Sequence, residues 1–79
     1  MHPIYFLEIE VSFKKGKLNQ SRKEWAVSKH DTPSGIMMHD NKTIDSLRER
    51  LFGSNYKGDK SFVITKVLEK KIVGYAANK

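Results

Sequence analysis

The stretch from Ile4 to Phe13 constrains the fold more than any other part of the chain. Every second residue from Tyr5 to Phe13 is apolar, and three of the four intervening positions from Phe6 to Ser12 are polar. A period of two is typical of a strand that buries one face. No other segment is as long, apolar and regular, so this stretch is predicted to be the central strand of a sheet.

The chain is short and contains no cysteine. Its 79 residues correspond to one domain, 1–79, in which 38% of the residues are hydrophobic and 10% aromatic. This composition is typical of a folded rather than a disordered chain. Disulfides and thiolate metal sites are excluded, so packing, oligomerisation or a bound partner must stabilise the fold.

The N-terminal residues do not have the features of a signal peptide. No apolar run approaches the ~20 residues that a membrane-spanning helix requires. We therefore expect a cytoplasmic protein that has no membrane partner.

Residues 4–30 are predicted to form a basic-tipped antiparallel hairpin. Glycine among lysines in Lys14–Lys17 indicates a turn, and the period of two resumes from Arg22 to His30. On this pattern, Trp25 and Val27 are expected to pack beside the apolar face of the first strand.

The middle of the chain is expected to contain one loop and one helix. Turn-forming residues begin the loop, which extends from Asp31 to Lys42. Within it, Ile36–Met38 closes the edge of the core, forms a short strand or presents an exposed binding patch. The helix covers residues 43–52, with Thr43 as its N-cap and Gly53 at its end. One apolar stripe predicts that it docks on the sheet: Ile44, Leu47, Leu51 and Phe52.

Residues 61–76 leave two interpretations open. The favoured one is a hairpin that turns at Glu69–Lys71, and the other is one long strand with a bulge. The fold class is therefore α+β: a small antiparallel sheet of three or four strands with one helix packed on one face, in the order β-β-α-β-β. One ten-residue helix cannot cover such a sheet, so part of the sheet is expected to stay open.

The net charge of +6 is concentrated in two segments. Residues 14–29 carry +5 and residues 60–79 carry +4. Lysines on a two-stranded ribbon can neutralise phosphates, which predicts nucleic-acid binding. Lysine outnumbers arginine twelve to three, so little sequence specificity is expected. The predicted contact residues are Lys14, Lys15, Lys17, Arg22, Lys23, Lys66, Lys70 and Lys71.

A protein-interaction or homodimerising module is the alternative, since an open sheet face or an edge strand needs a partner. Four aromatic residues bear on this choice, because they either stack on unpaired bases or pack in the core. They are Phe6, Trp25, Tyr56 and Tyr75.

Two His-Asp pairs, His30-Asp31 and His39-Asp40, flank the loop. Such pairs can bind a metal or act as a base with its orienting carboxylate. The dipeptide is common, however, and ordinary loop polarity is the favoured interpretation. The sequence therefore predicts no enzyme activity, no metal and no small-molecule cofactor.

Overall fold

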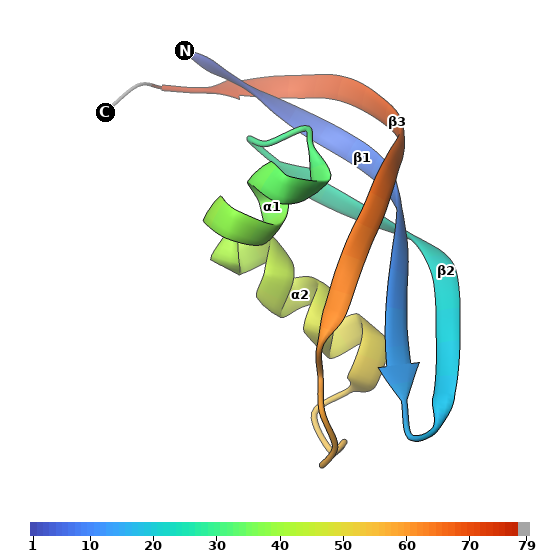
Figure 1. Ribbon diagram of the computed structural model, residues 1–79. Coiled ribbons are helices and arrows are strands. Elements are labelled where there is room, and N and C mark those ends of the chain that lie inside the picture. Colours follow the sequence, from blue (N-terminus) through green and yellow to red (C-terminus); the bar gives the residue numbers. More distant parts are fainter. Residues whose placement is uncertain (78–79) are drawn as a thin grey trace.

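Two long strands, two helices and a third long strand follow one another along the chain (Figure 1). The computed structural model describes residues 1–77. The elements are β1 (His2–Lys15), β2 (Leu18–Ser28), α1 (Pro33–His39), α2 (Asn41–Phe52) and β3 (Phe62–Ala76). The α+β class is confirmed, but the order is β-β-α-α-β, which matches the predicted β-β-α-β-β order only roughly. Across the described residues the strands form one antiparallel sheet in the order β2-β1-β3, with β1 central as expected.

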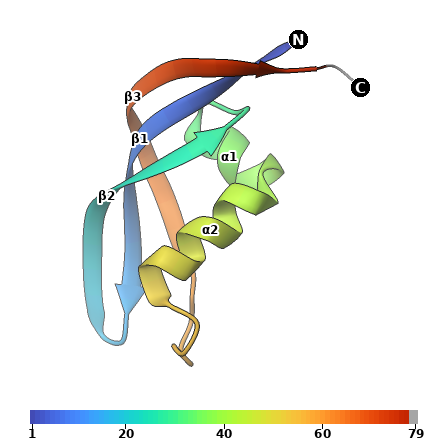
Figure 2. The same ribbon diagram turned by 180° about the vertical axis from the view of Figure 1, so that it is seen from behind.

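The core lies between one face of this sheet and the two helices. Leu7, Ile9 and Val11 of β1 have no exposed surface, and Phe13 is also buried. Both helices lie on the same side of the sheet, and the other face is left uncovered (Figures 1 and 2). The expected open face is therefore present, even though the chain has one helix more than predicted.

The turn between β1 and β2 is tight. Lys15 pairs with Leu18, so only Gly16 and Lys17 connect the strands. Gly16 has a φ of 66°, a left-handed conformation that glycine adopts without steric cost. Lysines therefore lie at the end of a two-stranded ribbon.

Trp25 and Val27 do not pack against the core, so that prediction is wrong. The register pairs Trp25 with Glu8 and Val27 with Phe6, which places both on the open face with 52% and 47% of their surface exposed. Their neighbours Ala26 and Ser28 are buried beneath the helices instead. Because successive residues of a strand face opposite sides, a shift of one residue in the pairing register exchanges its two faces. The small side chains of Ala26 and Ser28 leave room for α2 beside β2.

The predicted loop from Asp31 to Lys42 contains α1. Thr32 caps this helix by accepting a hydrogen bond from the Gly35 amide (3.1 Å), and the fixed φ of Pro33 suits the first helical position. Ile36 is fully buried and closes the core, whereas Met38 is 72% exposed. The turn-forming residues thus begin a helix instead of prolonging a loop.

The second helix starts two residues before the predicted position. The Asp40 carboxylate caps α2 by accepting a hydrogen bond from the Thr43 amide (3.0 Å). Thr43 is inside the helix and buried, so its predicted role as N-cap is wrong. The predicted apolar stripe is buried in full, and Gly53 ends the helix with a φ of 78°.

Residues 62–76 are one strand, so the favoured hairpin at Glu69–Lys71 is wrong. These residues pair continuously with β1, which is long enough to provide a partner over nearly the whole length of β3. The register shifts at three places, where Thr65, Leu68 and Val73 are extra residues on β3. Extra residues bend a strand and increase its twist, and β3 curves strongly in Figure 1.

Beyond Tyr5 the sheet narrows to a two-stranded ribbon. β2 ends at Ser28 opposite Tyr5, while the first residues of β1 continue to pair with the end of β3. The start of β1 and the end of β3 therefore lie side by side at the end of the molecule remote from the β1–β2 turn (Figure 1).

Candidate functional site

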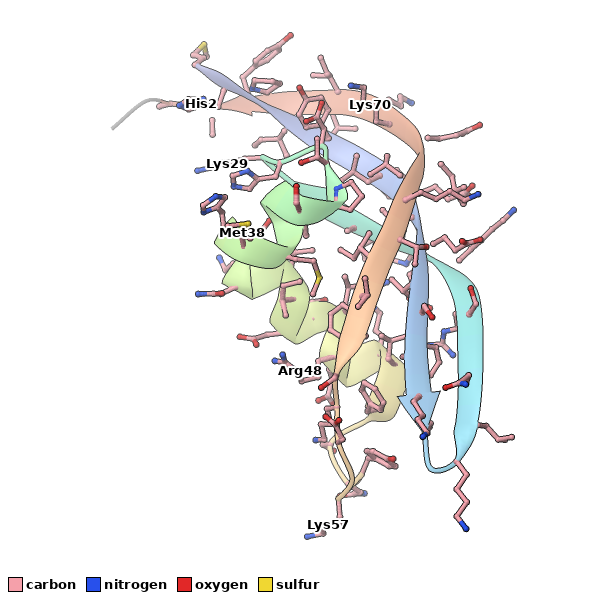
Figure 3. The ribbon with its side chains drawn as sticks, in the orientation of Figure 1. His2, Lys29, Met38, Arg48, Lys57 and Lys70 are labelled. Atoms are coloured by element: carbon pink, nitrogen blue, oxygen red, sulfur yellow. The ribbon has the colours of Figure 1, made fainter. Side chains whose placement is uncertain are left out.

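The β1–β2 turn gathers lysines from two parts of the chain. The Gly16 amide donates a hydrogen bond to the Tyr56 hydroxyl (3.0 Å), and Lys15 Nζ lies 5.6 Å from the centre of the Tyr56 ring. These contacts hold the loop after α2 beside the turn, and Figure 3 shows Lys57 at this end of the molecule. We call the resulting cluster the basic tip: Lys14, Lys15, Lys17, Lys57 and Lys60.

Two members of the basic tip, Lys57 and Lys60, were not among the predicted contacts. Tyr56 was the available signal, because an aromatic residue in a polar loop often anchors that loop to the body of the protein. The carboxylate in this loop, Asp59, accepts hydrogen bonds from the Ser61 hydroxyl (2.6 Å) and amide (3.0 Å). Those bonds lower the pKa of Asp59, so it stays ionised, but it is a single carboxylate in segments that carry five lysines.

Arg22 does not project with the basic tip. It lies on the helix-covered side of β2, where its Nε is 2.9 Å from Glu24 Oε2 and its Nη2 donates to the Arg50 carbonyl (3.0 Å). Arg50 pairs with the other Glu24 oxygen at 2.9 Å. The guanidinium of Arg22 is therefore committed to joining β2 to α2.

Lys23 and Lys66 lie on the open face, on either side of Glu10. Both are register partners of Glu10, and the Thr65 hydroxyl lies 3.1 Å from a Glu10 carboxylate oxygen. Lys71 lies opposite Phe6 farther along the same face. The face therefore alternates in charge and is less positive than the basic tip.

Lys70 is separated from its two predicted neighbours. In the strand register Lys70 lies opposite Leu7, on the helix-covered side of the sheet. Its Nζ is 2.9 Å from Asp31 Oδ2. The hydrogen bond with Lys70 lowers the pKa of Asp31, and the same contact raises the pKa of Lys70. The predicted patch of Lys66, Lys70 and Lys71 is thus divided between two faces.

The open face carries an exposed aromatic pair. The rings of Phe6 and Trp25 are nearly parallel, with an interplanar angle of 10° and centroids 6.1 Å apart. The Arg50 guanidinium lies 4.3 Å from the centre of the Trp25 ring. Tyr56 instead stacks on Phe52 beside the core, and Tyr75 is exposed near the end of β3, where it pairs with the start of β1.

The folded chain brings His30 and His39 together, with ring centroids 5.6 Å apart. Their acidic neighbours point to other partners: Asp31 binds Lys70, and Asp40 caps α2. Within residues 1–77, no group of three or more His, Cys, Asp or Glu side chains is placed to hold a metal ion.

Comparisons of the chain with protein-family models, curated proteins and solved structures gave no match. In the described part of the chain, no helix has the length and apolar character needed to cross a membrane.

Proposed function

We propose that the protein binds nucleic acid, mainly through phosphate contacts at the basic tip and with little sequence specificity. The observation that carries this proposal is that the lysine-rich loop after α2 is held against the lysine-rich β1–β2 turn by the contacts of Tyr56 with Gly16 and Lys15. Lysines so placed neutralise phosphates and release counterions. Lysine lacks the planar, bidentate donors with which arginine reads guanine, so the contacts favour backbone over base.

Lys23, Lys66 and Lys71 extend the proposed contact surface along the open face. The Phe6–Trp25 pair lies between them and offers a stacking surface to an unpaired base. A single strand that crosses from the tip onto this face would gain both contacts. The proposal therefore includes a preference for single-stranded over double-stranded nucleic acid.

A charge-reversal experiment tests the basic tip. Lys14→Glu is combined with Lys17→Glu, and Lys15 is kept because it lies on Tyr56. The matched control combines Lys29→Glu with Lys42→Glu, which changes the net charge equally at the far end of the molecule. Binding of 5′-hydroxyl oligonucleotides is followed by fluorescence anisotropy at several salt concentrations.

The tip variant should weaken binding strongly and reduce the slope of log K against log salt by about 2, since two phosphate contacts are lost. The control should keep most of the affinity and the slope. Equal losses in both variants would mean that only total charge matters. Unchanged binding by the tip variant would remove the basic tip as the site.

The second candidate function is a homodimer or another protein complex formed through the open face. The observation that favours it is the exposure of four large apolar side chains there: Phe6, Trp25, Val27 and Val63. Sedimentation velocity at increasing concentration tests self-association, with Val63→Lys as the disrupting variant. A monomer at all concentrations would contradict the homodimer.

A further inference from the structure

A cavity of about 450 Å³ lies where β2 ends, between the last residues of β2, the α1–α2 junction and the start of β1. It is remote from the basic tip, as the positions of Lys29 and Lys57 in Figure 3 show. Cavities of this size are typical of small-ligand sites. Its basic lining residues are Lys29, His30, His39 and Lys42.

Three elements converge to place these basic groups around one space. His30 follows β2, His39 ends α1 and Lys42 is in the first turn of α2. The imidazoles of His30 and His39 face each other with centroids 5.6 Å apart. Two cationic rings so close repel each other when nothing lies between them, whereas an anion bonded to both would reverse that effect.

Asp40 is the one carboxylate in the lining, and its oxygens are already used. Oδ2 accepts a hydrogen bond from the Ser28 hydroxyl (2.5 Å) and lies 2.7 Å from the Thr43 hydroxyl, while Oδ1 accepts from the Thr43 amide. Burial alone would raise the pKa of Asp40, but these hydrogen bonds outweigh it and hold the pKa below its ordinary value. Asp40 therefore acts as a fixed structural anion that orders the cavity wall.

We propose that this cavity binds the phosphate group of a phosphate monoester, with His30 and His39 as the two principal donors. Both imidazoliums would bond to phosphate oxygens, and Lys29 and Lys42 would add positive charge. The N-terminal end of α2 also favours an anion at this position. Ile4 and Val27 form an apolar wall against which the organic part of the ligand would pack.

The charge of the lining makes this site sensitive to pH. Two lysines and one carboxylate give +1 when both imidazoles are neutral and +3 when both are protonated. β1 contributes only the apolar Ile4 to the lining, and nearby Asp31 is neutralised by Lys70. Affinity should therefore be higher when both imidazoles are protonated, so it should rise as the pH falls.

A phosphate monoester of this kind can come from either of two sources. One is a small phosphorylated molecule, and the other is the terminal phosphate of a nucleic-acid strand. The site does not depend on the basic tip, so it stands if the proposed function fails. A second, smaller hollow shares Val27, Lys42 and Thr43 with this cavity and extends toward Trp25 and Arg50. A strand end bound in the cavity would thus have a path toward the aromatic pair.

Sulfate is the first probe, because it remains a dianion at both pH 5.5 and pH 7.5. NMR signals of the three imidazoles are followed as sulfate replaces chloride at constant ionic strength. The signals of His30 and His39 should shift and saturate together at pH 5.5, and the affinity should fall at least about tenfold at pH 7.5. His2, exposed at the start of β1, is the internal control and should not shift.

Substitution separates a bound anion from general screening. His30→Gln and His39→Gln should each weaken sulfate binding about tenfold at pH 5.5, whereas His2→Gln should leave it unchanged. Equal responses of all three histidines, or no saturable shift at pH 5.5, would overturn the proposal. Far-ultraviolet circular dichroism of each variant shows whether the fold is kept, and the wild-type titration decides the question if one variant unfolds.

Two further titrations distinguish the sources of the phosphate. A nucleoside 5′-monophosphate that binds more tightly than sulfate, at the same two histidines, would indicate a small phosphorylated ligand. Tighter binding of a 5′-phosphorylated than of a 5′-hydroxyl oligonucleotide, lost in His30→Gln, would indicate a strand end. Binding of sulfate without a gain for either monoester would contradict the assignment to phosphate monoesters.

Discussion

The two faces of β1 belong to one strand but serve different purposes. On one face Leu7, Ile9 and Val11 are fully buried beneath α1 and α2. On the other face Phe6 is 42% exposed, and Glu8 is the next residue on that face. No helix covers either of them. In a strand with a period of two, the side chains of one face can therefore form the core, while those of the other face stay available for binding.

The helices explain why only one face is buried. α2 contributes an apolar stripe centred on Leu47, which is fully buried, and α1 adds the fully buried Ile36. α1 has seven residues and α2 has twelve, which is enough to cover one side of three strands but not both. We therefore expect substitutions on the two faces to differ sharply in their effect on the free energy of unfolding.

The largest effect is expected from Ile9→Ala on the covered face. Removing a fully buried isoleucine side chain leaves a cavity, and the loss should be about 3 kcal/mol of unfolding free energy. Glu8→Ala, one residue away on the open face, should change it by less than about 1 kcal/mol. Urea denaturation measures both, and similar losses would contradict the proposed difference between the faces.

Asp40→Ala should have the next largest effect, a loss of about 1–2 kcal/mol. It removes the cap of α2 and leaves the buried Ser28 hydroxyl without its acceptor. Asp45→Ala is a suitable control, because that carboxylate is exposed and pairs only with Arg48 at the surface. We expect the control to change stability by less than about 0.5 kcal/mol.

The pH dependence of the Asp40 effect gives a second test. The folded-state pKa of Asp40 lies below its ordinary value of 3.8, so the ionised carboxylate stabilises the folded state. That stabilisation is present in full well above pH 3.8 and is lost as the pH falls through the folded-state pKa. The difference in stability between wild type and Asp40→Ala should be constant at neutral pH and shrink in acid. A difference that grows in acid would contradict this role.

The sequence predicts the central strand, the hairpin and the stripe of α2 because each depends on local periodicity. It fails at β2, where Trp25 and Val27 have the composition of a buried face but occupy the open one. The turn and the pairing register, not hydrophobicity, decide which face a short strand buries. α1 was missed for a related reason, since Thr32 and Pro33 suit a helix start as well as a turn.

The candidate sites show the same limit. Lys14, Lys15 and Lys17 are adjacent in sequence, so their cluster was predictable, whereas Lys57 joins them only through the contact between Tyr56 and Gly16. The predicted charges on β3 are separated for two reasons. Lys70 and Lys71 are adjacent and so face opposite sides, and the extra residue Leu68 places Lys66 on the opposite face from Lys70. The approach of His30 to His39 depends on α1, which turns the chain back toward the end of β2.

Of the three main substitutions, Ile9→Ala, Asp40→Ala and Trp25→Ala, the last is expected to have the smallest effect on stability, although tryptophan is the largest side chain in the protein. Its contacts are the Phe6 ring and the Arg50 guanidinium on a half-exposed surface, so the loss should be about 1 kcal/mol or less. Phe13→Ala, an aromatic deletion on the covered face of the adjacent strand, should cost about 3 kcal/mol or more. Urea denaturation compares the two variants. A larger loss for Trp25→Ala than for Phe13→Ala would mean that the aromatic pair forms a second core and that the open face is not free for binding.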